Sequence, residues 1–229
     1  MGSIIRFRFS VGSEVRFLSH LDLLRTLERA LRRTGLPIAH TEGFNPRPKM
    51  SFGFALPVGV MSWAEYGDFE FNEKVSPHAF ETLYNEHLPQ GFRVLAAETL
   101  PEGTPALMSV INAARYQIYI PGGSAAEVKE RVDWLKQVDT FVIERQTKKG
   151  VRKVNLRPLL LEVGPISPVG GGVEITTLSS LGKQGNLRID ELGQLLDFPY
   201  RDAVITRTAQ LIMDGEEFRE PMEIGVRDE

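Results

Sequence analysis

The segment SHLDLLRTLERALRRTG (19–35) decides how the first part of the chain folds. Its leucines recur at helical spacing, so the pattern predicts an amphipathic helix with one buried stripe. Ser19 is a favourable N-cap residue, and Gly35 supplies a stop signal. The preceding residues, IIRFRFSV (4–11), alternate between apolar and polar side chains and predict a strand.

Strand and helix patterns continue along the rest of the chain, and the order β-α-β-β-α-β occurs twice. The expected strands are 4–11, 50–60, 65–72, 92–100, 114–120, 140–147, 151–158, 172–180 and 203–213, and the expected helices are 19–35, 76–89, 124–137 and 187–197. A connector rich in Pro and Gly is expected at 164–172. The predicted fold class is therefore α+β, with two tandem ferredoxin-like (βαββαβ) units, the second carrying an extra hairpin strand.

This reading divides the chain into four parts. Residues 1–100 form the first unit, 101–113 a connector, 114–213 the second unit and 214–229 an acidic C-terminal tail. Little sequence identity links the two halves, so the repeat rests on the order of the elements.

The composition excludes several classes of chemistry. The chain of 229 residues contains no cysteine, which excludes disulfides, thiolate nucleophiles, zinc-thiolate sites and cysteine-ligated iron–sulfur clusters within it. Its four histidines lack metal-ligand spacing, so we expect no metal and no cofactor. Its uncharged runs are too short and too broken to span a bilayer, and no signal peptide is recognisable. We therefore expect a cytoplasmic protein without a membrane partner.

The net charge of −3 conceals two basic zones. Residues 1–60 contain nine Lys/Arg and four Asp/Glu, and residues 145–157 contain six basic residues and no acidic one. Basic zones within a mildly acidic protein indicate localised anion sites.

The loop HTEGFNPRPKMSFGFALPVG (40–59) combines aromatic and cationic residues on a backbone that its prolines stiffen. Aromatic rings that stack on bases and cations that bind phosphates are typical of a nucleic-acid surface. With the basic face of the preceding helix, the candidate residues are Arg25, Arg29, Phe44, Asn45, Arg47 and Lys49. The alternatives are a solvated helix face and phenylalanines that fill the core, and we favour the core for Phe52 and Phe54.

The second half offers a further set of cations. The hairpin KKGVRKVNLRP (148–158) is basic, and GKQGNLR (182–188) runs into a helix with backbone N–H groups suited to a phosphate. The candidate anion-binding residues here are Arg152, Arg157, Lys183, Asn186 and Arg188. The alternatives are an edge strand that its lysines protect from aggregation and an ordinary capped turn.

His20 is the one histidine in a position that could serve catalysis. It stands at the start of the first helix, where a neutral imidazole could act as a general base. The alternative, which we favour, is a histidine that helps to cap the helix.

The stretch RFLSHLDLLRTLERALRRTGLPIAHTEGFNPRPKMSFGFALPVGV (16–60) resembles the signature of the bacterial radical-SAM-linked proteins of unknown function. The likeness extends through LPEGTPALMSVINAARY (100–116), the Arg-Pro of NLRP and the GKQGNLR loop, so it covers most of the chain. Members of this family are fused to radical-SAM proteins or encoded near them. The resemblance thus implies a radical-SAM partner, which would hold the cluster that this cysteine-free chain cannot bind.

A weaker similarity, at the level of the fold, is to the CRISPR repeat-processing endoribonucleases. They pair two ferredoxin-like units and often use a histidine near the first helix, where His20 is similarly placed. The chain departs from them because GKQGNLR precedes the last helix and strand, whereas their glycine-rich loop lies near the C-terminus.

Three functions remain open from the sequence. The first is an RNA-binding or substrate-presenting accessory protein that works with a radical-SAM or RNA-processing partner, with no role for DNA. The second is a metal-independent endoribonuclease that uses His20. The third is a protein-binding adaptor that docks through its acidic C-terminal tail.

Overall fold

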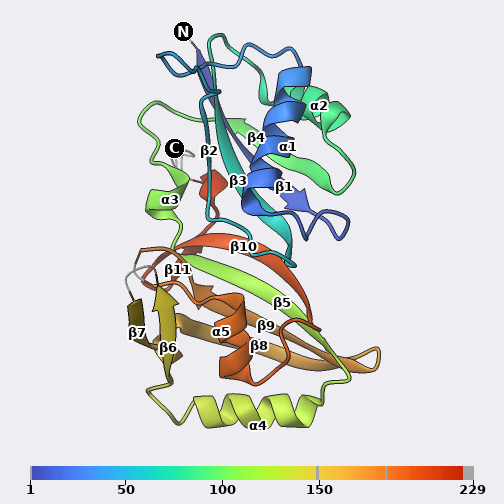
Figure 1. The fold of residues 1–229 in the computed structure, drawn as a ribbon, viewed down its shortest axis with the longest axis vertical. Helices are drawn as coiled ribbons and strands as arrows, with labels where there is room; N and C mark the ends of the chain where they lie inside the picture. The colour runs from blue at the N-terminus through green and yellow to red at the C-terminus, as the bar shows by residue number, and fades with distance from the viewer. Residues whose placement is uncertain (1, 148–149, 184, 224–229) are drawn as a thin grey trace. The chain divides into compact units, whose positions relative to one another are not determined.

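The alternating residues near the start of the chain form strand β1 (Ser3–Val11), as predicted (Figure 1). One side of this strand is apolar and buried, and it carries Ile5, Phe7, Phe9 and Val11. The other side carries Arg6 and Arg8. This division decides where the helices pack.

The structure is a computed structural model that describes residues 2–147, 150–183 and 185–223. They form two compact units, of which the first runs to Ile111 and resumes at Ala209 and the second is Asn112–Thr208. Five α-helices and a large, mostly antiparallel sheet in these residues confirm the predicted α+β class.

The first unit is built on the strand order β4-β1-β3-β10, with β2 paired to β3 and β11 paired to β10. The recorded pairings of β1 with β3, β1 with β4 and β2 with β3 are antiparallel. Besides β1, its elements are α1 (His20–Arg33), β2 (Met50–Phe52), β3 (Met61–Phe71), α2 (Pro77–His87), β4 (Phe92–Thr99), α3 (Leu107–Val110), the end of β10 (Val204–Asp214), β11 (Glu217–Arg219) and the 3-10 turn η2 (Pro221–Glu223).

Helix α1 begins and ends where its capping residues predict. The Ser19 hydroxyl accepts a hydrogen bond from the Asp22 backbone N–H (3.2 Å), which satisfies one free donor of the first turn. The leucine stripe of the helix is buried. Helix α2 packs beside it, and the Tyr84 hydroxyl donates to the Leu27 carbonyl (2.9 Å). Figure 1 shows the two helices side by side.

Aromatic rings form the core between these helices and the sheet. The Phe7 ring lies 4.6 Å from that of Phe69 and 5.2 Å from that of Phe80, centroid to centroid. Opposite Phe7 in the β1–β3 register is Gly67, where an added Cβ would lie 2.7 Å from the Phe7 ring and 3.0 Å from that of Phe52. Only glycine allows this close approach.

Strand β4 lies at the end of the strand order, so among the described residues no further strand pairs with its outer edge. The Asn85 side chain of α2 binds both backbone groups of Val94 on this strand: Oδ1 accepts from the N–H (2.8 Å) and Nδ2 donates to the C=O (3.1 Å). An amide side chain thus occupies positions that another strand would otherwise use, which protects the edge from aggregation.

The second unit has the strand order β10-β5-β9-β8, and β6 and β7 form a separate two-stranded sheet. Serine caps its first helix, since the Ser124 hydroxyl accepts from the Glu127 N–H (3.4 Å). Besides the start of β10, its elements are β5 (Ala113–Pro121), α4 (Ala125–Leu135), β6 (Val142–Thr147), β7 (Gly150–Asn155), the 3-10 turn η1 (Arg157–Leu159), β8 (Leu160–Val169), β9 (Gly172–Ser180) and α5 (Ile189–Leu196).

Two sequence-based element predictions are wrong, and helix α3 and strand β11 were not predicted. The expected strand at 50–60 ends at Phe52, because Gly53 and Pro57 interrupt it and residues 53–60 follow an irregular path. The connector expected at 164–172 is largely strand β8, which pairs with β9 through two register shifts. Proline is tolerated there because β8 is the last strand in the order, and its unpaired edge requires no N–H donor.

The side of the first sheet opposite α1 and α2 is covered by the chain's own later segments. Arg6, whose side chain is fully buried, binds Asp68 of β3 through two hydrogen bonds of 2.8 and 2.9 Å. Its remaining donors reach the carbonyls of Pro105 (3.1 Å) and Pro221 (3.0 Å). Nearby, Arg8 pairs with Glu220 (2.9 Å). The part of the acidic tail that the structure describes is therefore packed against the first sheet.

Glu98 on β4 lies opposite Arg6 in the strand register. Burial raises the pKa of its carboxyl above the ordinary value of 4.5, and this effect outweighs the opposing attraction of Arg6, while Asp68 raises the pKa further. The folded protein thus disfavours the ionised form of Glu98.

We expect Glu98→Gln to raise the melting temperature at pH 7, because the ionised carboxylate is less stable in the folded state than in the unfolded one. A raised acid pKa contributes stability that is complete below pH 4.5 and is lost as pH rises through the folded value. Thermal melts of both proteins from pH 3.5 to pH 8 test this. The difference should vanish at the acidic end, and a difference that is constant with pH would show that titration is not its cause.

Candidate nucleic-acid interface

The loop after α1 is closed at its base by backbone hydrogen bonds. The Thr41 N–H donates to the Arg47 carbonyl (2.8 Å), and the Arg47 N–H donates to the Thr41 hydroxyl (3.0 Å). Below this closure, His40 and Pro48 form an isolated antiparallel bridge. At the turn itself, Gly43 adopts a φ of +118°, which side chains rarely allow. Residues 41–47 are thus a defined loop on a fixed base.

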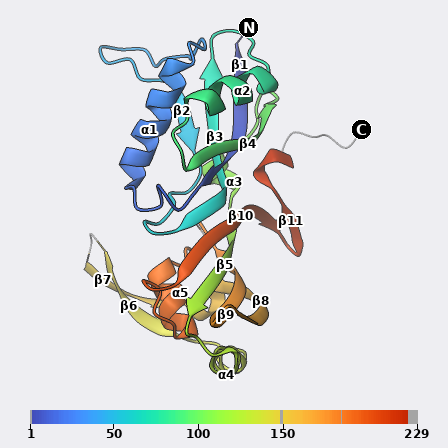
Figure 2. The ribbon, with the colours of Figure 1, turned by 90° about the vertical axis from the view of Figure 1, so that its right-hand side faces the viewer.

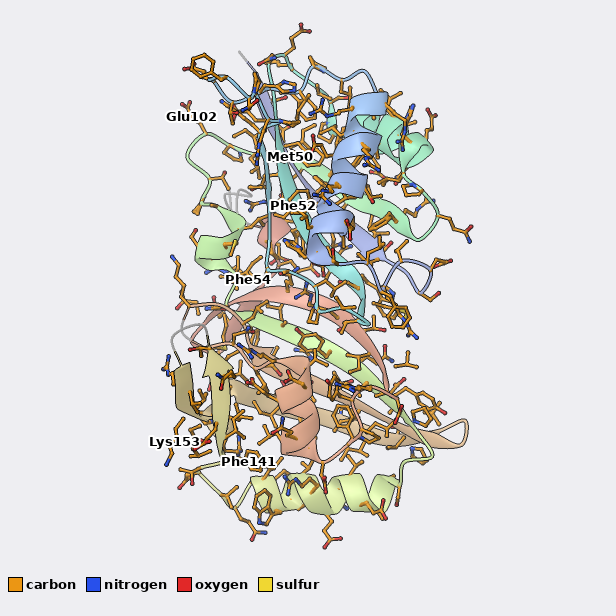
Figure 3. The ribbon with its side chains drawn as sticks, in the orientation of Figure 1. Met50, Phe52, Phe54, Glu102, Phe141 and Lys153 are labelled. Atoms are coloured by element: carbon orange, nitrogen blue, oxygen red, sulfur yellow. The ribbon has the colours of Figure 1, made fainter. Side chains whose placement is uncertain are left out.

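The loop presents its side chains to solvent. Phe44 has a relative exposure of 106%, and Asn45 and Arg47 are also exposed. Phe52, in contrast, is half-buried and packs its ring against those of Phe7, Phe9 and Phe69 (Figure 3). Phe44 is thus fully exposed, whereas Phe52 and Phe54, which were expected in the core, are half-buried.

The exposed face of α1 carries four arginines in different environments. Arg25 pairs weakly with Asp22 (3.4 Å), and Arg32 pairs with Glu28 (2.7 Å). Arg33 donates to the carbonyl of His87 at the end of α2 (2.6 Å). Arg29 is exposed, and no ion pair is recorded for it among residues 2–147, 150–183 and 185–223.

Lys49 leaves the loop and pairs with Glu70 of β3 at 2.8 Å, with both side chains about two-fifths exposed. The four predicted cations thus fall into two groups. Arg25 and Lys49 hold carboxylates of their own, whereas the structure records no ion pair for Arg29 or Arg47 in the part of the chain it describes. Because exposed ion pairs contribute little free energy, a phosphate could replace either carboxylate at low cost.

The sequence analysis missed Phe17, which lies just before α1. Its relative exposure is 68%, and the guanidinium carbon of Arg16 lies 4.8 Å from its ring centroid. The available signal was the pair Arg16-Phe17 in front of the helix cap. A pattern of apolar residues cannot distinguish an exposed phenylalanine from a buried one.

In the second unit, the β6–β7 hairpin is joined to the loop before α5. Arg145 of β6 makes two bonds of 2.6 Å to the buried carboxylate of Glu191, and a third, of 3.0 Å, to the Asn186 carbonyl. Arg152 lies directly opposite Arg145 on β7, and Figure 3 shows Lys153 on the outer side of the hairpin. Arg145 was not predicted as a site residue.

The predicted phosphate loop at 182–188 has its helix terminus occupied by a protein carboxylate. The Arg188 N–H donates to Glu191 Oε2 (3.0 Å), as in a capped turn. The side chains of Lys183, Asn186 and Arg188 are exposed, and residue 184 lies outside the described residues. The hairpin and this loop therefore bring together Arg152, Asn186 and Arg188 around the Arg145–Glu191 ion pair, in which the two charges neutralise each other.

Arg157 has a structural role in this arrangement. Its side chain is half-buried, with Nε donating to the Leu135 carbonyl (2.7 Å) and Nη1 to the Leu160 carbonyl (3.1 Å). The first of these carbonyls belongs to the last turn of α4, where a cation is favoured by the helix dipole. The guanidinium of this predicted site residue thus bonds carbonyls of the protein's own backbone.

His20 is the first residue of α1 and is exposed. Together with Glu65, Tyr66 and the surrounding apolar side chains it lines a cavity of about 10 Å³. Such a volume holds about one water molecule. The cavity offers no room for a nucleotide.

The part of the chain that the structure describes contains neither a membrane-crossing helix nor a cluster of metal ligands. No helix among residues 2–147, 150–183 and 185–223 has the length and apolar character needed to cross a bilayer. In the same residues, no three His, Asp or Glu side chains gather where they could hold a metal ion.

The fold and these surfaces define an α+β protein with an exposed aromatic and basic loop. Residues 5–189 match the family model described as "Uncharacterized protein conserved in bacteria (DUF2344)". Because the match covers most of the chain, the protein belongs to this bacterial family. No curated protein matches the chain.

Proposed function

We propose that this protein binds RNA through the 41–47 loop and the exposed face of α1, and presents it to an enzyme partner. The observation that carries the proposal is Phe44, a fully exposed ring on a closed loop, three residues from the exposed Arg47.

The exposed ring of Phe44 is a source of binding free energy. An exposed phenylalanine leaves about 1.5–3 kcal/mol of burial free energy unused, and a partner that covers the ring recovers it. An RNA base can do so by stacking, which contributes about 1–3 kcal/mol per base. The closure between Thr41 and Arg47 holds the loop before binding, so little conformational entropy is lost when a ligand arrives.

The partner that we propose is a radical-SAM or RNA-processing enzyme, in the cytoplasm. The resemblance of residues 16–60 to the radical-SAM-linked proteins supports this partner, and the absence of cysteine assigns any iron–sulfur chemistry to it. The chain would then supply substrate recognition.

The fold that we propose is a pair of ferredoxin-like units. In the first unit, β1 lies between β4 and β3, and β2 pairs with β3. In the second, β5 lies between β10 and β9, and β8 pairs with β9, while the β6–β7 hairpin is inserted after α4. The same relation of first, third and last strand in both units supports the proposal.

The test is a double charge reversal, Arg29→Glu with Arg47→Glu. We chose these two because the structure records no ion pair for either among the described residues, so their replacement leaves no carboxylate without its cation. Affinity for RNA recovered by crosslinking from cells should fall about ten- to a hundredfold at low salt, or roughly 1.4 kcal/mol per contact. The slope of log affinity against log salt should flatten by about 0.7 per lost phosphate contact.

The matched control is Arg93→Glu, a charge reversal at an exposed residue of β4 in the same unit. It should leave both affinity and salt slope close to wild type, and thermal melts should show that all variants fold. If wild type binds no RNA, or if the double variant binds as tightly as wild type at low salt, the proposed interface is wrong. Copurification of a protein partner that the double variant still captures, from a wild type that binds no RNA, would favour the adaptor function instead.

A further inference from the structure

Phe17 is held in place as firmly as Phe44. Two turns fix its segment, with the Val15 N–H donating to the Gly12 carbonyl (3.3 Å) and the Leu18 N–H to the Val15 carbonyl (3.0 Å). The backbone of Arg16 is also tied to the segment before β3, because its carbonyl accepts from the Gly59 N–H (2.8 Å). The exposed ring therefore projects from a fixed segment.

The two exposed rings lie at opposite ends of α1. Phe17 precedes its N-cap, and Phe44 belongs to the loop that follows its last turn. Figure 2 shows α1 along one side of the first unit, with this loop projecting beyond the upper end of the helix. A helix of 14 residues is about 21 Å long, at about 1.5 Å per residue. The rings are thus too far apart to contact a single base.

The surface between them carries positive charge. Arg25 and Arg29 lie four residues apart on the exposed face of α1, and Leu21, which is 56% exposed, continues the same row toward Phe17. Arg16 adds a cation at the first ring and Arg47 one near the second. Cations between two rings match a ligand with several phosphates and unpaired bases at each end.

We propose that the RNA bound by this protein is single-stranded and lies along α1, with one base stacked on Phe17 and another, several nucleotides away, on Phe44. This inference rests on the proposed function and specifies its substrate class. The reason for a single strand is that a duplex hides the faces of its bases within its own stack, and proteins recognise it by shape and by contacts to phosphates and 2′-hydroxyls. Two exposed rings serve a ligand whose base faces are free.

Three synthetic probes test the inference. They are an unstructured RNA decamer of mixed sequence, the duplex of that decamer with its complement, and an abasic decamer with the same number of phosphates. A decamer lies within the range of about 4–16 nucleotides that single-strand binding folds cover. The wild type should bind the single-stranded decamer more tightly than either of the other two.

The variants are Phe17→Ala and Phe44→Ala. Each should weaken binding of the single-stranded decamer about 5- to 150-fold, since stacking contributes about 1–3 kcal/mol per base. Neither should change the salt slope, because no phosphate contact is lost. Neither should alter affinity for the abasic decamer. Phe17→Tyr, which retains a ring, should bind nearly as wild type does.

The matched control is Phe218→Ala, which removes another partly exposed ring from the first unit, on β11. It should bind all three probes as wild type does. The inference is overturned, while the proposed function stands, if RNA binds but the duplex binds as tightly as the single strand, or if Phe17→Ala binds the decamer normally. If none of the three probes binds to the wild type, the inference fails, and if the RNA recovered by crosslinking does not bind either, the proposed function fails with it.

Discussion

Replacement of Arg6 by methionine should lower the free energy of unfolding by about 3–5 kcal/mol, the usual effect of removing one partner from a buried ion pair. The side chain is fully buried and makes four hydrogen bonds, two to Asp68 and one each to the carbonyls of Pro105 and Pro221. Its loss leaves a largely buried carboxylate without a cation and two carbonyls without their donor. Urea denaturation of the two proteins measures the difference.

A second variant separates the charge from the hydrogen bonds. Arg6→Met combined with Asp68→Leu removes both charges, so it should be less destabilising than Arg6→Met alone, although the two carbonyls still lack a donor. Limited proteolysis should cut residues 214–223 faster in Arg6→Met, because Pro221 loses its hydrogen bond. If the free energy of unfolding of Arg6→Met lies within about 1 kcal/mol of the wild-type value, Arg6 does not stabilise the fold as its contacts indicate.

Replacement of Glu191 by alanine should destabilise the second unit by a similar amount, about 3–5 kcal/mol. Its carboxylate is almost fully buried, binds Arg145 through two bonds of 2.6 Å and caps α5 by accepting from the Arg188 N–H. Without it, Arg145 remains partly buried and unpaired, and the link between the β6–β7 hairpin and α5 is lost. Urea denaturation measures the loss in free energy of unfolding. Hydrogen exchange should be faster at the backbone amides of 142–147.

Two controls make this prediction specific. Glu191→Gln retains an acceptor for the Arg188 N–H and should be less destabilising than Glu191→Ala, because only the charge is lost. Lys136→Ala removes an exposed pair with Asp133 and should leave stability unchanged within error. Equal unfolding free energies for wild type and Glu191→Ala would mean that the pair does not hold the hairpin.

Helices α1, α2, α4 and α5 could be predicted closely because their signals are local, whereas the short helix α3 was not predicted. Ser19, Ser76 and Ser124 each precede a helix and each accepts a hydrogen bond from a backbone N–H of the first turn. A cap and a periodic stripe are both contained within a dozen residues. For the same reason, the exposed loop after α1 could be recognised as a candidate site from its own composition.

Features that depend on distant residues could not be predicted. Alternation placed Arg6 on the side of β1 away from the core, and only its bonds to Pro105 and Pro221, 99 and 215 positions later, show that this side is covered. Arg145 was counted only as one of the six basic residues at 145–157, because its partner Glu191 is 46 positions away. Strand β8 was missed since its prolines disfavour a strand unless it lies at an edge, and edge position is a property of the whole sheet.

The first unit is built from two separate segments of the chain, so its parts become available at different times during synthesis. When a ribosome has released the residues through Ile111, the end of β10, strand β11 and turn η2 have not yet been synthesised. Arg6 and Arg8 then lack the bonds to Pro221 and Glu220, so this side of the sheet is without two of the contacts that it has in the complete protein. The second unit, whose residues are continuous, can fold in the meantime. The part of the protein that starts to emerge first is thus the part that is completed last.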